Sequence, residues 1–222
     1  MITNNDDAPI YRDWLGMEVV APVDVEEELE EFQDETIEVN VNSFGGEVEP
    51  AAQIYTMLRN AKKKVVVNIE SSAYSAGTIV AMAGDTVRIS PSAQMMIHKA
   101  SSGAFGNSDD LQKGLNMLNA TDRTIANVYA TKTGKPAEDF LVLMGKETWL
   151  SPQDAVDLGL ADEIMSFNAE PITNLAKPIV AYDKVQKIKN LVKENKKLKK
   201  QDSQLANDEL KQRKLAIFYG KD

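Results

Sequence analysis

The chain has 222 residues and a formal net charge of −9, and 43% of its residues are hydrophobic, which is the composition of an ordinary globular protein. It contains no cysteine and a single histidine, His98, so a disulfide framework, a cysteine nucleophile and a histidine-rich zinc site are excluded. No apolar run approaches the roughly 20 residues of a membrane span, and the first residues lack the features of a signal peptide. We therefore expect a cytoplasmic protein that binds no membrane.

The charge is unevenly distributed along the chain. Residues 184–222 hold twelve basic and five acidic side chains, a balance of +7, whereas residues 1–183 hold 13 basic and 29 acidic side chains, a balance of −16. The field of such an acidic body disfavours nucleic-acid binding, so no nucleic-acid partner is expected. We expect a folded domain at residues 1–165, a linker at 166–183 and a basic, helical or disordered tail at 184–222.

Helix and strand patterns alternate through the first half of the chain. Residues 24–32 place apolar side chains at helical spacing, and residues 65–69 form a β-branched run typical of a buried parallel strand. From residue 37 the predicted order is strand 37–41, a helix opened by Pro50, strand 65–69, helix 75–83, strand 86–90 and strand 94–98. This order predicts a layered α/β core.

The second half of the domain is mostly helical. Ser108 is the predicted cap of a long helix, and Gly134 lies just past its end. A short helix is expected at residues 136–144, and Ser151 opens a further helix before a final strand at residues 160–165.

Three features lie at ends of elements, where an α/β sheet presents its site. Paired glycines, Gly45 and Gly46, let a backbone N–H approach a ligand, although local spacing alone favours a plain tight turn. Ser75 lies between a strand and a helix, as a nucleophile or as a helix cap. His98 ends a strand and is either structural or the one side chain able to act as a base near neutral pH.

Four motifs together resemble the proteolytic subunit of the Clp protease, the peptidase family ClpP. They are Asn42-Ser-Phe-Gly-Gly46, Ser72-Ala-Tyr-Ser-Ala-Gly77, Met95-Met-Ile-His98 and Trp149-Leu-Ser-Pro-Gln-Asp-Ala-Val-Asp-Leu-Gly-Leu-Ala-Asp162. The resemblance covers residues 37–165 and is closest to shorter members encoded by phages and prophages, which are assigned to prohead maturation. It implies a ClpP/crotonase-like layered fold of repeated βαβ units with a long handle helix at residues 108–130.

The same resemblance implies a set of site residues. The catalytic positions of the family fall on Ser75 as nucleophile, His98 as general base and Glu147 as third triad member, and the oxyanion-hole positions fall on Gly46 and Ala76. Glutamate replaces the aspartate of the family at the third position, so Asp154 and Asp157 are alternative carboxylates. Phe44 and Tyr74 also depart from the family pattern, which has proline and a small residue there.

The implied function is a serine endopeptidase that hydrolyses unfolded polypeptides, or capsid and scaffold precursors, inside a homo-oligomeric ring without metal or cofactor. A Clp unfoldase ATPase is the partner that the resemblance implies, but the absence of a recognisable apolar N-terminal segment argues against its docking. Three alternatives remain open: a catalytically silent ring-forming assembly factor, a crotonase-like acyl-CoA enzyme, and a Ser–Lys dyad in place of the histidine.

Overall fold

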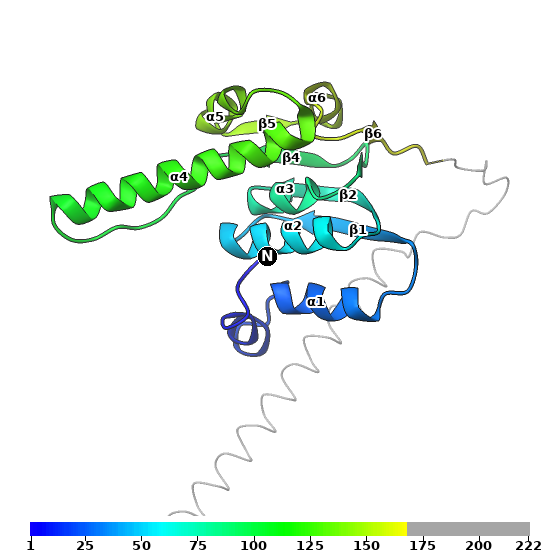
Figure 1. Ribbon diagram of the computed structural model, residues 1–222, viewed down its shortest axis with the longest axis horizontal. Coiled ribbons are helices and arrows are strands. Elements are labelled where there is room, and N and C mark those ends of the chain that lie inside the picture. Colours follow the sequence, from blue (N-terminus) through cyan, green and yellow to red (C-terminus); the bar gives the residue numbers. More distant parts are fainter. Residues whose placement is uncertain (168–222) are drawn as a thin grey trace, which may run out of the picture. The chain divides into compact units, whose positions relative to one another are not determined.

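Four of the predicted strands form the main part of one sheet in the computed structural model, which describes residues 1–167 (Figure 1). They are β1 (Thr36–Ser43), β2 (Lys64–Tyr74), β3 (Thr86–Ile89) and β4 (Gln94–Ile97). Two short strands, β5 (Thr148–Leu150) and β6 (Glu163–Ile164), complete the sheet. β6 lies inside the strand predicted at 160–165, whereas β5 is not predicted because three residues carry too little alternation. The predicted α/β class is confirmed.

β2 is the centre of this sheet because it pairs with three other strands. β1 lies parallel to it on one side, while β3 and β4 lie parallel to it, one after the other, on the opposite side. β5 pairs antiparallel with β4, and β6 pairs parallel with β3. Parallel neighbours end at the same edge of a sheet, so the carboxyl ends of β2 and β4 lie side by side.

The first half of β2 is buried on both faces. Val65, Val66 and Val67 are at most 4% exposed, which requires packing on both sides of the sheet. Helices α2 (Val48–Asn60) and α3 (Ala76–Ala81) contact each other, and α3 also contacts β1 and β2 (Figure 1). Each fully buried valine contributes about 1.5–3 kcal/mol. This packing fixes the junction between β2 and α3, where Ser75 lies.

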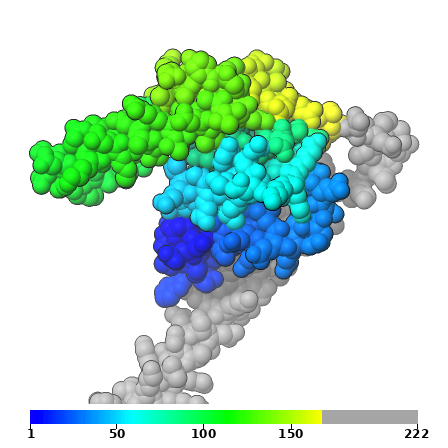
Figure 2. Space-filling model, in the orientation of Figure 1, coloured from blue at the N-terminus to red at the C-terminus, as the bar shows by residue number. Residues whose placement is uncertain are grey.

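Helix α4 (Ser108–Thr133) is the predicted long helix. Its N-cap is Asn107, whose Oδ1 accepts the backbone N–H groups of Asp109 and Asp110, so the cap predicted at Ser108 is wrong by one residue. Gly134 ends the helix with a left-handed φ of 70°, as predicted. The N-terminal half of α4 projects beyond the sheet (Figures 1 and 2).

Two further helices complete the C-terminal part of the domain. Helix α5 (Ala137–Gly145) packs on α4, and helix α6 (Pro152–Leu158) lies against β4, β5 and β6. Ser151 caps α6 through its side-chain oxygen and Gly159 ends it with a φ of 82°, so both predicted boundaries are confirmed.

The N-terminal part of the domain holds two helices. α1 (Pro22–Glu31) corresponds to the helix predicted at 24–32, while the π-helical turn η1 (Ile10–Trp14) is not predicted. An ion pair between Arg12 and Asp24 joins η1 to α1. α1 in turn contacts α2.

The predicted tail and all but two residues of the predicted linker lie beyond the described range, so these domain limits stay predictions. Within residues 1–167, no helix is both long and apolar enough to cross a membrane. The cytoplasmic location also stays a prediction.

Candidate active site

Ser75 is the single residue between β2 and α3, and its backbone is held in an unusual conformation. Its φ is 53° and its ψ is −124°, a region that residues with a side chain rarely occupy and that is typical of strained functional turns. The Ser75 N–H donates to the carbonyl of Met96 at 2.8 Å, and its carbonyl accepts the N–H of Thr78 at 2.9 Å. These bonds fix the direction of the Ser75 side chain.

His98 follows β4 directly and lies beside Ser75. The Nε2 atom of His98 is 2.7 Å from the Oγ atom of Ser75, within hydrogen-bond distance. Tyr74 and Met96 are partners in the parallel register of β2 and β4, so the residues that follow these strands are brought together. The half-buried imidazole makes no other side-chain hydrogen bond within residues 1–167. The serine and the histidine therefore have the geometry of a nucleophile and its base.

The paired glycines approach the nucleophile closely, which goes beyond a plain tight turn. A Cβ atom on Gly45 would lie 2.7 Å from the Cβ of Ser75, so no other residue fits there without a shift. A Cβ atom on Gly46 would lie 1.9 Å from the carbonyl oxygen of Ile2. The N–H of Gly46 has no hydrogen-bond partner within the described part of the chain, and the N–H of Ala76, as the first of α3, has none in its own helix.

The N-terminal residues hold this glycine loop, a role that the sequence does not reveal. The N–H of Ile2 donates to the carbonyl of Gly45 at 2.9 Å, and its carbonyl accepts the N–H of Glu47 at 3.0 Å. The hydroxyl of buried Thr3 donates to a carboxylate oxygen of Glu47 at 2.6 Å, which lowers the pKa of Glu47. These contacts join residues more than 40 positions apart, and no local pattern marks them.

The backbone of Glu147 lies near that of His98 in space, but the Glu147 side chain is exposed and does not hydrogen-bond to the imidazole. Ile97 of β4 faces Thr148 of β5, so the antiparallel register continued by one residue places Glu147 opposite His98. The φ of Glu147 is 50°, which turns the chain just before β5.

The alternative carboxylates are used inside α6. Asp154 accepts the N–H and hydroxyl of Ser151, and these bonds lower the pKa of Asp154. Asp157 accepts a hydrogen bond from the side chain of Gln153. Neither carboxylate contacts His98 by a hydrogen bond.

A small pocket of about 10 Å³ adjoins the serine and the histidine. Besides Ser75, Ala76 and His98, its lining residues are Val48, Ile79, Ala100, Ile125 and Tyr129. The hydroxyls of Tyr129 and Thr78 lie 2.6 Å apart, and burial raises the pKa of Tyr129, so its phenol stays protonated. The pocket offers room for about one water molecule.

Three aromatic rings pack together near the nucleophile. The ring centroids of Phe44 and Tyr74 are 5.6 Å apart, and those of Tyr74 and Trp149 are 5.0 Å apart. The two residues that depart from the family pattern, Phe44 and Tyr74, are therefore in ring contact, although Phe44 is 79% exposed.

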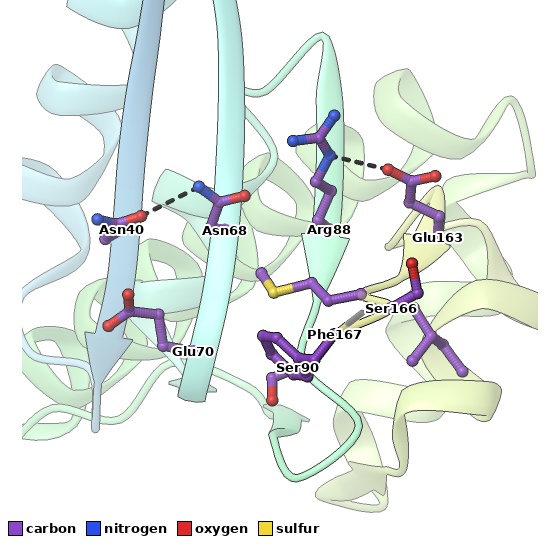
Figure 3. Close-up of a pocket in the computed structure, with 10 residues that line it drawn as sticks. Asn40, Asn68, Glu70, Arg88, Ser90, Glu163, Ser166 and Phe167 are labelled. Atoms are coloured by element: carbon purple, nitrogen blue, oxygen red, sulfur yellow. Dashed lines mark hydrogen bonds and ion pairs between the residues drawn. The ribbon is translucent and has the colours of Figure 1, made fainter. Parts of the chain in front are cut away.

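A larger pocket of about 560 Å³ lies elsewhere on the sheet and has a polar lining (Figure 3). Asn68 donates to Asn40 at 3.1 Å on one side of it, and Arg88 pairs with Glu163 at 2.8 Å on the other. Its two serines have no histidine beside them, so it lacks a nucleophile and base pair. No cluster of three or more side chains suited to a metal ion occurs in the part of the chain that the structure describes.

A family model described as Clp protease matches residues 27–168, well over half of the chain. The chain belongs to the Clp protease family. The matched region contains Ser75, His98 and Glu147. As a member of this family, the chain is a serine-type peptidase. The predicted closeness to phage-encoded members of the Clp protease family stays a prediction.

Named relatives agree with this assignment. The chain is 30% identical to an ATP-dependent Clp protease proteolytic subunit of Deinococcus radiodurans over 139 residues, 62% of this chain and 68% of the relative. It is 29% identical to ATP-dependent Clp protease proteolytic subunit 3 of Rhizobium etli over 139 residues, 62% of this chain and 72% of that one. Membership of the Clp protease family does not favour the acyl-CoA alternative.

Among solved structures, the fold is similar to that of a point mutant of ClpP1 from Listeria monocytogenes. The TM-score is 0.60 at 24% sequence identity, and the match covers 66% of this chain and 85% of that one. The similarity shows that the layered Clp protease fold is present.

Proposed function

We propose that this chain is an endopeptidase in which Ser75 is the nucleophile and His98 is the general base. The 2.7 Å distance between Ser75 Oγ and His98 Nε2 carries the proposal. His98 takes the hydroxyl proton, Oγ bonds to the carbonyl carbon of the scissile peptide, and the C–N bond breaks as His98 returns the proton to the leaving amine. A water molecule, deprotonated by His98, then hydrolyses the acyl-enzyme.

The backbone N–H groups of Gly46 and Ala76 are the proposed oxyanion-hole donors. Both belong to segments that flank Ser75, and neither N–H has a hydrogen-bond partner among the described residues that would compete with a substrate. Such donors stabilise the negative charge of the tetrahedral intermediate, and loss of one costs roughly 10²–10³ in kcat.

Glu147 is the proposed third member of the triad. The β4–β5 register supports it, because the residue opposite His98 is Glu147. Its longer side chain must turn toward the imidazole to accept the Nδ1 proton, as a triad carboxylate does. Because the carboxylate is exposed, we expect Glu147→Gln to lower kcat less than loss of Ser75 or His98 does.

The proposed substrates are unfolded polypeptides, including the capsid or scaffold precursors that the resemblance to phage-encoded members implies. The small pocket between Ala100 and Ile125 supports a preference for a small side chain before the scissile bond. We expect peptides with alanine at this position to be cleaved with higher kcat/KM than matched peptides with phenylalanine.

A homo-oligomeric ring is part of the proposal. The projecting half of α4 is seen in Figure 2. It carries Leu111 and Leu115, which are 49% and 51% exposed, so their apolar surface is in contact with water in the single chain. Stacking of these helices between copies of the chain would cover it. An ATPase partner is not required by the reaction, because each of its steps uses only the residues named above and water.

The test is intact-mass analysis after exposure to a fluorophosphonate, which labels activated serines. We expect one adduct on the wild-type chain and none on Ser75→Ala or His98→Ala. Labelling that survives in His98→Ala would favour the lysine dyad, although no lysine in residues 1–167 hydrogen-bonds to Ser75. An assembled wild-type chain that is never labelled would overturn the peptidase and favour the silent assembly factor.

A further inference from the structure

Asp122 is a buried carboxylate that the proposed reaction does not use. It lies in α4, is 5% exposed, and is the only buried acidic side chain among residues 1–167. A buried carboxylate is costly unless it is well paired, because it loses its hydration. The burial of Asp122 therefore requires contacts that compensate for the lost hydration.

Both carboxylate oxygens of Asp122 contact the two residues that follow His98. Oδ1 accepts the backbone N–H of Ala100 at 2.8 Å, and Oδ2 lies 3.6 Å from the ammonium of Lys99. The lysine is 49% exposed, so the backbone hydrogen bond is the more buried of the two contacts. On the same helix, Ile125 follows one turn later and lines the small pocket beside Ser75.

The segment that carries the proposed base has an anchor on each side. Before His98, β4 ends at Ile97, which pairs with Thr148 of β5. After it, the Asp122 bond holds Ala100, and the exposed loop 101–107 begins. Without the second anchor, His98 would be the first residue of a loop of about ten residues.

We propose that Asp122 is a positioning residue for His98. By fixing Ala100, it keeps the imidazole at hydrogen-bond distance from Ser75 Oγ. This inference rests on the proposed function, in which that distance governs the first proton transfer. A shift of about 1 Å in a catalytic group can cost on the order of 10²-fold in rate.

The first measurement is the rate of fluorophosphonate labelling, with kcat and KM on a peptide, for the full chain. We expect Asp122→Ala to lower kcat about 10- to 100-fold with KM changed less than about twofold. Asp122→Asn keeps an oxygen that accepts the Ala100 N–H, so it should stay within about fivefold of wild type. Asp122→Leu, which fills the space without an acceptor and avoids a cavity, should behave like Asp122→Ala.

Asp162 offers a chemically matched control in another part of the fold. Its carboxylate also accepts a backbone N–H, from Val87 at 2.6 Å, and also pairs with a lysine, Lys132 at 2.8 Å. Asp162→Ala therefore removes the same kinds of contact and should leave kcat unchanged. Equal losses in Asp122→Asn and Asp122→Leu, or full activity in Asp122→Leu, would overturn the positioning role.

A second measurement does not depend on peptidase activity. Because His98 is the only histidine, a ¹⁵N spectrum of the chain labelled in histidine and purified without a histidine tag reports this ring alone. We expect Asp122→Leu to shift the ring signals in the direction seen for Ser75→Ala, and Asp122→Asn to keep the wild-type signals. An unchanged spectrum in Asp122→Leu would overturn the inference even if the wild-type chain proved inactive, and failure of the proposed function would appear separately as an unlabelled wild-type serine.

Discussion

Backbone strain is concentrated at the residues of the proposed site. Three residues other than glycine have a positive φ in the described part of the chain, namely Lys62, Ser75 and Glu147, and two of them belong to the proposed triad. Such conformations cost on the order of 1–3 kcal/mol each and persist only where surrounding contacts hold them. At Ser75 the hydrogen bonds to Met96 and Thr78 provide that support.

Ser75→Gly should therefore be more stable than Ser75→Ala, although both variants lose labelling by the fluorophosphonate. Glycine adopts a φ of 53° without steric cost. We therefore expect the free energy of unfolding of Ser75→Gly to exceed that of Ser75→Ala by about 1 kcal/mol. Urea denaturation of the two variants measures the difference. A Ser75→Gly variant less stable than Ser75→Ala would contradict strain at this residue.

Gly46→Ala should remove most of the activity. Its Cβ would lie 1.9 Å from the carbonyl oxygen of Ile2, so the loop must move and carry the Gly46 N–H away from the oxyanion position. We expect a loss of about 10²-fold in kcat, measured on a peptide substrate. Gly16→Ala is the control, because Gly16 also has a positive φ, of 63°, but nothing within 4 Å, and it should keep the wild-type kcat.

At the scale of elements, Asp85 ties α2 and the start of β2 to the turn that precedes β3. Its carboxylate accepts the N–H of Val65 at 2.9 Å and a guanidinium N–H of Arg59 at 2.7 Å. The Val65 bond lowers the pKa of Asp85, and together with the Arg59 contacts it outweighs the opposing effect of partial burial. The ionised form is therefore favoured in the folded state.

This shift predicts a pH-dependent contribution to stability. The folded-state pKa of Asp85 lies below its unfolded value, so the stabilisation is fully present above about pH 4 and is lost as the pH falls through the folded pKa. Because the side chain is 43% exposed, we expect Asp85→Asn to lower the free energy of unfolding at pH 7 by only about 0.5–1 kcal/mol.

Urea denaturation at pH 7 and at pH 3 checks this expectation, since the difference from wild type should shrink at the lower pH. Asp139→Asn is a suitable control, because that carboxylate accepts no side-chain hydrogen bond within residues 1–167. A difference for Asp85→Asn that stays constant with pH would show that its ionisation is not linked to folding.

At the scale of the whole molecule, the projecting half of α4 is accompanied by the loop 101–107, where Ala104 lies against Gly114, and its leucines stay about half exposed. Its leucines continue the apolar stripe that is buried further along, where Ile125 and Tyr129 pack into the core. Burial of such a stripe between copies of the chain would stabilise the assembly by about 25 cal/mol for each Å² of apolar surface removed from water. The fold of the single chain thus leaves a surface suited to self-assembly.

We expect the double variant Leu111→Lys, Leu115→Lys to sediment as smaller species than wild type while keeping its helical content. Charges on this stripe oppose association but remove few contacts within the chain, because both side chains are about half exposed. The matched control is Gln112→Lys, Asn116→Lys, which adds the same charge to exposed polar positions of the same helix. Equal sedimentation of both double variants would argue against the leucine stripe as the interface.

Local sequence is sufficient to predict the alternation of strands and helices, the buried run of β2, the helix ends at Gly134 and Gly159, and the serine and lone histidine as candidates. Periodicity, caps and backbone φ depend on residues only a few positions apart, which is why these features can be read along the chain. Which groups meet depends on tertiary packing. The approach of His98 to Ser75, the Ile2 clamp on the glycine loop and the Asp122 bond to Ala100 each join residues at least 22 positions apart, and their geometry follows from strand register and helix packing rather than from any local pattern.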